Sequence, residues 1–278
     1  MAYGSVLTNV SALSATRNLG LTGMGLDKTI TRLTTGRRIN QASDDAAGLA
    51  IGNKLGADIR VAQQARRNAF DGINMLQVAD GILDEVTNLL TRAIELTEQA
   101  RTGTISNSNK EALNIEFQKI ITAIDNLSTG TKFNGQTVFN DKGTYTVAIA
   151  DFTDQDITIG AMAGNLKTGD NKLTENSGNL LKLTASVGTA LRAELDAALQ
   201  AVSMQRATIG AMQQNLNSFA NSLGIQVENF SAARSTIFDA NIADEVVNLT
   251  KLQILNQSGT SALGQSNQVS QSILALLR

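Results

Sequence analysis

The sequence predicts a mainly α-helical protein built from long coiled-coil helices, with a small β-hairpin region in the middle of the chain. No proline interrupts the 278 residues, so long continuous helices are permitted. Apolar residues recur at alternating spacings of four and three over several stretches, which is the pattern of a coiled-coil seam. One central stretch alternates apolar and polar residues instead, which is typical of strands.

The first 33 residues predict a helix that carries few large apolar side chains. Its apolar register contains one slip of a single residue after the third member. The register consists of Val6, Val10, Leu13, Leu19, Leu26, Ile30 and Leu33.

The stretch "TTGRRINQASDDAAGLAI", residues 34 to 51, predicts a connector and the start of the next helix. Ser43 stands where an N-cap is expected, and the new helix is expected to begin at Asp44, because acidic residues are favoured in a first turn. Asp44 and Asp45 could also form a catalytic or metal-binding pair, but nothing nearby supplies a pocket. We expect Arg37 and Arg38 to pack or to form salt bridges, because no phosphate-binding loop accompanies them.

Two further helices are expected before residue 130. The first has a broad apolar face, and its seam is Met75, Ala79, Ile82, Val86, Leu89, Ala93, Leu96 and Ala100. The second covers residues 106 to 127 and carries apolar residues on one side. These residues are Leu113, Phe117, Ile120, Ile124 and Leu127.

The period of the apolar residues changes between residues 131 and 160. Tyr145, Val147 and Ile149 alternate with small or polar residues, and "DITI" follows, which predicts a β-hairpin. Residues 161 to 186 are rich in Gly, Asn, Thr and Lys, and we expect them to form a loop.

The longest seam extends from residue 191 to residue 237. It implies a helix of roughly 70 Å at about 1.5 Å per residue. All of its members are apolar except two glutamines, and they are Leu191, Leu195, Ala198, Val202, Gln205, Ile209, Met212, Leu216, Phe219, Leu223, Gln226, Phe230, Ala233 and Ile237.

The C-terminal segment, residues 242 to 278, resembles the N-terminal one in having few charges. One register continues through it, with the members Leu252, Leu255, Gly259, Ala262, Ser266, Val269, Ile273 and Leu276. Helices so poor in charge and in large apolar residues gain little from water or from an isolated core. We therefore expect both ends to pack against other helices, and our hypothesis is that this packing is intermolecular.

Composition excludes several classes of function. The chain has no Cys, His or Trp, which removes the residues most used for zinc sites, nucleophilic triads and proton transfer near neutral pH. Its net charge of −2 gives no overall basic field for nucleic acid or an anionic membrane. No apolar run approaches the roughly 20 residues of a membrane span, and the N-terminus lacks the pattern of a cleaved signal peptide. We expect no cofactor and no metal.

Three blocks of the sequence resemble bacterial flagellin. The first is "TTGRRINQASDDAAGLAI", the second is residues 67 to 100, and the third is residues 223 to 278, which include "SGTSALGQSNQVSQSILALLR". The resemblance covers about residues 1 to 140 and 187 to 278. One departure is Ser270, where many flagellins carry proline.

The resemblance implies a long antiparallel helical coiled-coil rod formed by both chain ends. Residues 1–43 and 238–278 would form an inner terminal coiled-coil domain with its connector. Residues 44–237 would form an outer helical domain with the β-hairpin at about 131–160 and the loop at 161–186. Few residues remain between the two halves, so we expect the minimal form without large variable outer domains.

The resemblance also implies a structural protein and not an enzyme, one that self-assembles into the helical flagellar filament used for swimming. Two alternatives remain: a hook-filament junction (hook-associated) adaptor, and a hydrolase that uses Asp44 and Asp45. The implied partners are further copies of the chain, a flagellar export chaperone and hook-associated proteins, with no nucleic acid and no membrane. The implied location is the secreted filament, exported by the flagellar type III apparatus without a cleaved signal peptide.

Two sets of site residues follow from these expectations. An innate-immune contact with the flagellin-sensing Toll-like receptor would use Arg92, Leu96 and Glu116, although Leu96 also belongs to a seam and the two charged residues could be ordinary surface groups. The residues expected to support polymerisation are Val6, Val10, Leu13, Ile30, Leu33, Leu252, Leu255, Val269, Ile273 and Leu276.

Overall fold

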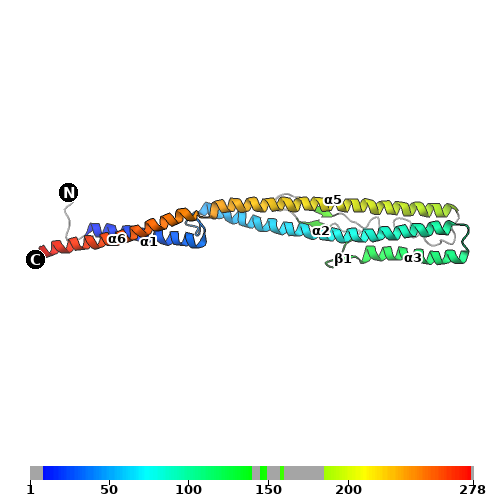
Figure 1. Cartoon of the computed structure of the whole chain (residues 1–278), viewed down its shortest axis with the longest axis horizontal. Helices are drawn as coiled ribbons and strands as arrows, with labels where there is room; N and C mark the ends of the chain where they lie inside the picture. The colour runs from blue at the N-terminus through cyan, green and yellow to red at the C-terminus, as the bar shows by residue number, and fades with distance from the viewer. Residues whose placement is uncertain (1–8, 140–144, 149–156, 160–184, 277–278) are drawn as a thin grey trace. The chain divides into compact units, whose positions relative to one another are not determined.

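The computed structural model describes residues 9–139, 145–148, 157–159 and 185–276. Long helices dominate this part of the chain (Figure 1). The helices are α1 (Val10–Thr35), α2 (Ala46–Arg101), α3 (Asn107–Gly130), α5 (Ala185–Phe238) and α6 (Ile242–Leu276). The strands are β1 (Lys132–Phe133), β2 (Gln136–Thr137), β3 (Tyr145–Val147) and β4 (Ile157–Ile159). The predicted fold class, mainly α with a small β region, is confirmed.

The chain forms two compact units, and α2 and α5 contribute to both. Unit 1 consists of Met1–Ile59 and Glu228–Arg278, and unit 2 of Arg60–Val227. The chain therefore passes from one unit to the other within α2 and again within α5. The predicted domain boundaries lie elsewhere, at residues 43/44 and 237/238.

Unit 2 has a continuous apolar core between α2, α3 and α5. In this unit α5 runs antiparallel to α2, since Arg206 bonds Asp80 and Arg192 bonds Glu98, and α3 returns alongside α2 (Figure 1). Leu76, Leu83 and Leu96 of α2 are fully buried. Other fully buried side chains are Phe117 of α3 and Leu191, Leu195, Ile209 and Leu216 of α5. The predicted seams of all three helices are thus confirmed within unit 2.

The β region contains two short antiparallel pairs, so the prediction of one hairpin was incomplete. Tyr145–Val147 pairs with Ile157–Ile159, in the two segments that the sequence predicted as strands. The second pair, β1 with β2, turns at Asn134 and Gly135, whose φ angles are 50° and 82°. Two consecutive residues at positive φ are typical of a tight type I′ hairpin turn, for which Asn-Gly is a favoured sequence. The predicted loop at 161–186 lies outside the described residues except for its last two, which begin α5.

Unit 1 contains α1 and α6, which run antiparallel to each other (Figure 1). The direction follows from contacts at both ends of the pair: Asn9 Nδ2 donates to the Ser266 carbonyl at 3.3 Å, and Arg32 Nη1 lies 3.1 Å from Glu245 Oε1. Asn9 also caps α1 by accepting the Ala12 N–H, and Gly36 ends the helix at a φ of 67°.

The connector between α1 and α2 is held by the two adjacent carboxylates. Asp44 Oδ1 lies 2.6 Å from Lys28 Nζ, and Asp44 Oδ2 accepts the N–H groups of Asn40 and Gln41 at 3.1 and 3.2 Å. Asp45 Oδ1 accepts the Gly48 N–H at 2.8 Å, so Asp45 is the N-cap.

The expectation that Ser43 caps a helix beginning at Asp44 was therefore wrong, since α2 begins at Ala46. Asp44 instead closes the preceding turn, and this leaves Asp45 at the helix end. Both carboxylates have structural partners and no catalytic role is needed to explain them. Within the described ranges no group of three or more His, Cys, Asp or Glu side chains could hold a metal ion.

The bond to Lys28, followed by those to Asn40 and Gln41, lowers the pKa of Asp44 to about 2. The carboxyl is only 7% exposed. Because the folded pKa lies below the unfolded value of about 3.9, Asp44 stabilises the fold above pH 4 and loses this contribution as the pH falls toward 2.

We therefore expect Asp44→Asn to be less stable than wild type at pH 7, with a difference that shrinks as the pH falls from about 4 to about 2. Urea unfolding of the full-length monomer across this range measures the difference. Asp27→Asn is the control, because Asp27 is an exposed carboxylate of α1 close to Lys28. A difference between wild type and Asp44→Asn that stays constant down to pH 2 would contradict the assignment.

Candidate functional site

The pair formed by α1 and α6 is the first candidate surface, because it joins the two ends of the chain through small side chains. A Cβ atom added at Gly25 would lie 3.4 Å from Leu252, and one added at Gly259 would lie 3.2 Å from Leu19. Gly259 therefore lets Leu19 approach the backbone of α6 closely, whereas the Leu252 contact at Gly25 has an ordinary van der Waals length. The seam therefore combines glycines with leucines that pack against the opposite helix.

The register of this seam differs from the predicted one. On α1 the less exposed positions include a register that continues without a slip. Its members are Ala12, Ala15, Leu19, Thr22, Leu26, Thr29 and Leu33. On α6 they are Glu245, Leu249, Leu252, Asn256, Gly259, Leu263 and Ser266. Leu255 and Val269 of α6, and Val10, Leu13 and Ile30 of α1, therefore lie outside the seam between α1 and α6. Their expected part in polymerisation stays a prediction.

Apolar side chains of similar size lie both within the seam and outside it, so size alone does not decide which side of each helix contacts the other. Val10 and Leu13 are 70% and 73% exposed, and Val269 is 53% exposed. Leu255 and Ile30 are also exposed, whereas Leu33 and Leu252 are half-buried within the seam. Val6 and the side chains of Ile273 and Leu276 lie outside the described residues.

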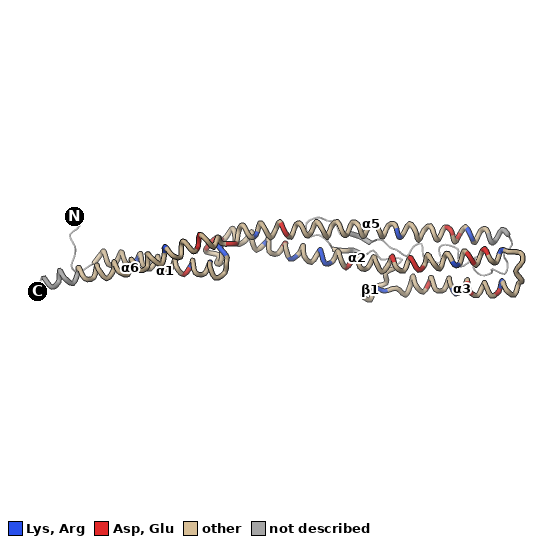
Figure 2. The backbone as a smooth tube through the Cα atoms, viewed as in Figure 1, with Lys and Arg blue, Asp and Glu red and all other residues tan. Residues whose placement is uncertain are grey.

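The outer side of this pair is unusually apolar for a surface. Further exposed apolar side chains are Leu21, Met24, Ile242, Val246, Val247 and Ile254. Figure 2 shows that α6 carries almost no charged residues beyond its first turns, while charges recur along α2 and α5 of unit 2. We name the exposed apolar residues of α1 and α6 the outer terminal face. An apolar area of this kind is typical of a surface that binds another protein.

One ion pair specifies how α1 and α6 align. Glu245 is 8% exposed and follows Asp244 in the first turn of α6, and it binds Arg32 in the last turn of α1. Each charge therefore also lies at the favourable end of its helix dipole. The sequence analysis missed this pair because its members are 213 positions apart. The signal that could have identified it is that charged residues are rare in both segments.

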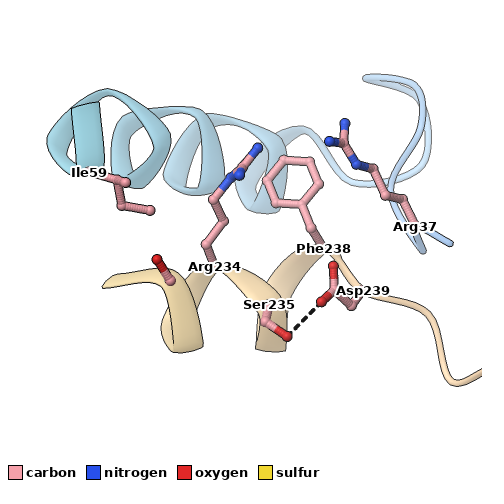
Figure 3. Close-up of a pocket in the computed structure, with 7 residues that line it drawn as sticks. Arg37, Ile59, Arg234, Ser235, Phe238 and Asp239 are labelled. Carbon is pink, nitrogen blue, oxygen red and sulfur yellow. Dashed lines mark hydrogen bonds between the residues drawn. The ribbon is translucent and has the colours of Figure 1, made fainter. Parts of the chain in front are cut away.

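A second candidate site surrounds Phe238, at the C-terminal end of α5. The guanidinium carbons of Arg37 and Arg234 lie 5.9 and 5.5 Å from the centroid of the Phe238 ring (Figure 3). Gly52 of α2 lies directly against this ring, because a Cβ atom at that position would overlap it. Backbone bonds also join the connector to this end of α5: Arg38 N–H donates to the Phe238 carbonyl at 2.7 Å.

The expected receptor-contact residues lie in unit 2, and the structure brings two of them together. Arg92 donates from Nε and Nη2 to Glu116 Oε1 at 3.0 and 2.9 Å, and from Nη1 to Glu95 at 3.1 Å. These bonds, the one to Glu116 first, raise the pKa of Arg92. Leu96 is fully buried in the core, so the expectation that it contributes to an exposed contact needs correction.

None of the helices in the described residues combines the length and apolar character that a membrane span needs.

Comparison with known proteins gives two family matches. Residues 6–144 match the bacterial flagellin N-terminal helical region, and residues 193–277 match the bacterial flagellin C-terminal helical region. Together these regions include more than half of the chain.

Several full-length relatives are also similar. Flagellin of Halalkalibacterium halodurans is 38% identical, flagellin FlaB2 of Treponema pallidum 35%, and flagellin of Bacillus subtilis 34%. In each case the match covers 97% of this chain and 98% of the relative. These names favour a filament subunit over the hook-filament junction adaptor. With both helical regions matched in order and the relatives covered almost completely, this chain belongs to the bacterial flagellin family, and it is a structural subunit of the extracellular flagellar filament.

Proposed function

We propose that this flagellin polymerises mainly through the outer terminal face of α1 and α6. The observation that carries the proposal is the exposure of Val10, Leu13 and Ile30 on α1 and of Leu255 and Val269 on α6. Complete burial of one such side chain contributes about 1.5–3 kcal/mol relative to leaving it in water. In a homopolymer, a neighbouring copy supplies an equally apolar surface to cover it.

The half-buried members of the same helices have a different role in this proposal. Leu33 and Leu252 lie in the seam between α1 and α6, where they hold the two helices together and so position the outer terminal face. Val6, Ile273 and Leu276 continue the proposed polymerisation helices in the sequence, and their contribution is part of the proposal.

We also propose the domain organisation expected from the sequence, in which the terminal segments polymerise and the remaining helices form the body of the subunit. The terminal segments, about 1–43 and 238–278, would line the interior of the filament, and the helical body with its short β pairs would face outward. We propose export by the flagellar type III apparatus, as membership of the flagellin family implies. An export chaperone would cover the outer terminal face before assembly, and hook-associated proteins would contact it at the filament ends.

The assembly proposal predicts that Leu255→Gln combined with Val269→Gln raises the critical concentration for polymerisation by at least about tenfold. A tenfold change corresponds to about 1.4 kcal/mol, which is less than the burial of one such side chain contributes. Glutamine keeps a good helix propensity, so the monomer should retain its helical content. Sedimentation of polymer from protein seeded with filament fragments gives the critical concentration, and electron microscopy gives filament length.

Met204→Gln is the matched control, because Met204 of α5 is 66% exposed but lies in unit 2. Equal critical concentrations for the double variant and wild type would refute the proposal. Short structures of fixed size from the wild-type protein would favour the hook-filament junction adaptor instead.

We further propose that Arg92 and Glu116 form a contact for a flagellin-sensing Toll-like receptor. The support is that both side chains are about half-exposed, at 49% and 44%, and that they form one continuous polar surface across α2 and α3. Arginine is among the residues that most often dominate protein interfaces. Leu96 would act only by supporting α2 from within the core.

We expect Arg92→Ala to weaken receptor signalling by the monomer while its helical content stays unchanged, because an exposed ion pair contributes little to folding. A reporter-cell assay with purified monomer measures the effect. Arg67→Ala is the control, since Arg67 is exposed on the same helix and bonds only Gln64 among the described residues. Wild-type signalling by Arg92→Ala would remove this residue from the contact.

A further inference from the structure

The surroundings of Phe238 contain two arginines whose charge has no partner in the described part of the chain. No carboxylate lies within ion-pair distance of Arg37 or Arg234 there, and Arg234 Nε is buried without a hydrogen-bond acceptor. A buried guanidinium donor is costly to leave without an acceptor. A carboxylate in the adjoining pocket would therefore neutralise positive charge that the described residues leave without an ion pair.

The two arginines border a pocket of about 130 Å³, which we name the Arg37–Arg234 pocket. Ile59 and Phe238 supply its apolar wall, and Ser231, Ser235 and Asp239 complete it. The two guanidinium groups flank the ring of Phe238 in Figure 3, whereas the Asp239 carboxylate turns toward Ser235. Asp239 Oδ2 accepts the Ser235 hydroxyl at 2.6 Å, so this carboxylate is already engaged.

The geometry suits a short acidic side chain. A carboxylate accepts hydrogen bonds from arginine forks in a fixed planar geometry, which makes these bonds strong. The methylene groups of an Asp or Glu side chain would contact Phe238 and Ile59, and the small volume would exclude a large apolar group.

We propose that the Arg37–Arg234 pocket binds an acidic side chain of a second copy of this chain and so forms a polar contact between filament subunits. The proposal rests on the proposed polymerisation, because a homopolymer brings copies together at high local concentration. The chain itself supplies suitable groups. Asp71 and Glu85, for example, are exposed on α2 and form no ion pair within the described residues.

Zero-length cross-linking tests the contact and identifies its source. In Arg234→Lys filaments, a water-soluble carbodiimide should join the new lysine amine to a carboxylate of a neighbouring copy. Filaments grown from a mixture of isotope-labelled and unlabelled subunits distinguish links between copies from links within one copy by mass spectrometry. Arg67→Lys filaments give the background yield.

We expect a link from residue 234 between copies in filaments and none in the monomer. A link that forms equally in the monomer would overturn the proposal, because the carboxylate would belong to the same copy. The proposal would also be overturned if no link above background formed. If Arg234→Gln nevertheless impaired assembly, the result would indicate that the pocket binds a free anion.

Assembly of Arg234→Gln and Arg37→Gln provides the functional readout. Each should raise the critical concentration about tenfold at low salt, and the difference from wild type should shrink as sodium chloride increases, because salt screens charges. Circular-dichroism melting of each monomer verifies folding, and the second variant covers the case in which the first fails to fold.

The Leu255→Gln, Val269→Gln double variant separates the two proposals. If it fails to assemble while both arginine variants assemble as wild type at low salt, the pocket inference is wrong and polymerisation through the outer terminal face stands. If all of these variants assemble normally, both are wrong.

Discussion

The close pairing of α1 with α6 determines what the rest of unit 1 can do. Leu252 and Leu19 pack against Gly25 and Gly259 of the opposite helix, and the seam between the two helices also contains polar residues such as Asn256. Many other apolar side chains of both helices are exposed. An isolated pair of helices gains only limited stability from its own packing when many apolar side chains stay exposed, because most helix stability in proteins comes from burying an apolar face. This imbalance makes the ends of the chain dependent on contacts with other molecules.

Unit 2 shows the opposite balance. Its core is continuous, with Leu83, Phe117 and Leu216 fully buried. Its helices are also joined by ion pairs at their exposed edges, such as Arg206 with Asp80 and Asp84, which raise the pKa of this arginine, the bond to Asp80 most. Such exposed pairs contribute little to stability, but they favour one alignment of the helices. One chain thus combines a unit with a complete core and a unit with an outward apolar face, as a filament subunit requires.

The sequence predicted the helices of unit 2 well because their apolar and polar faces are distinct. It did not identify which side of α6 contacts α1, because apolar residues surround that helix and Leu255 is as apolar as the seam residue Leu252. Periodicity alone could not separate the side that contacts α1 from the side that stays exposed. The predicted N-cap of α2 was two residues too early, because Ser43 fits the same local pattern as Asp45. The bond from Lys28 to Asp44 engages that carboxylate in the connector and leaves Asp45 as the cap. The pocket around Phe238 combines residues about 200 positions apart, and no local signal brings Arg37 to Arg234.

Amide hydrogen exchange of monomer and filament, compared helix by helix, tests most directly the claim that the outer terminal face is buried on assembly. The account predicts that amides of α1 and α6 exchange much more slowly in the filament than in the monomer, because neighbouring copies stabilise these helices against local opening. Amides in the α2, α3 and α5 core of unit 2 should be well protected in both states. Equal exchange of α1 and α6 in monomer and filament would contradict the account.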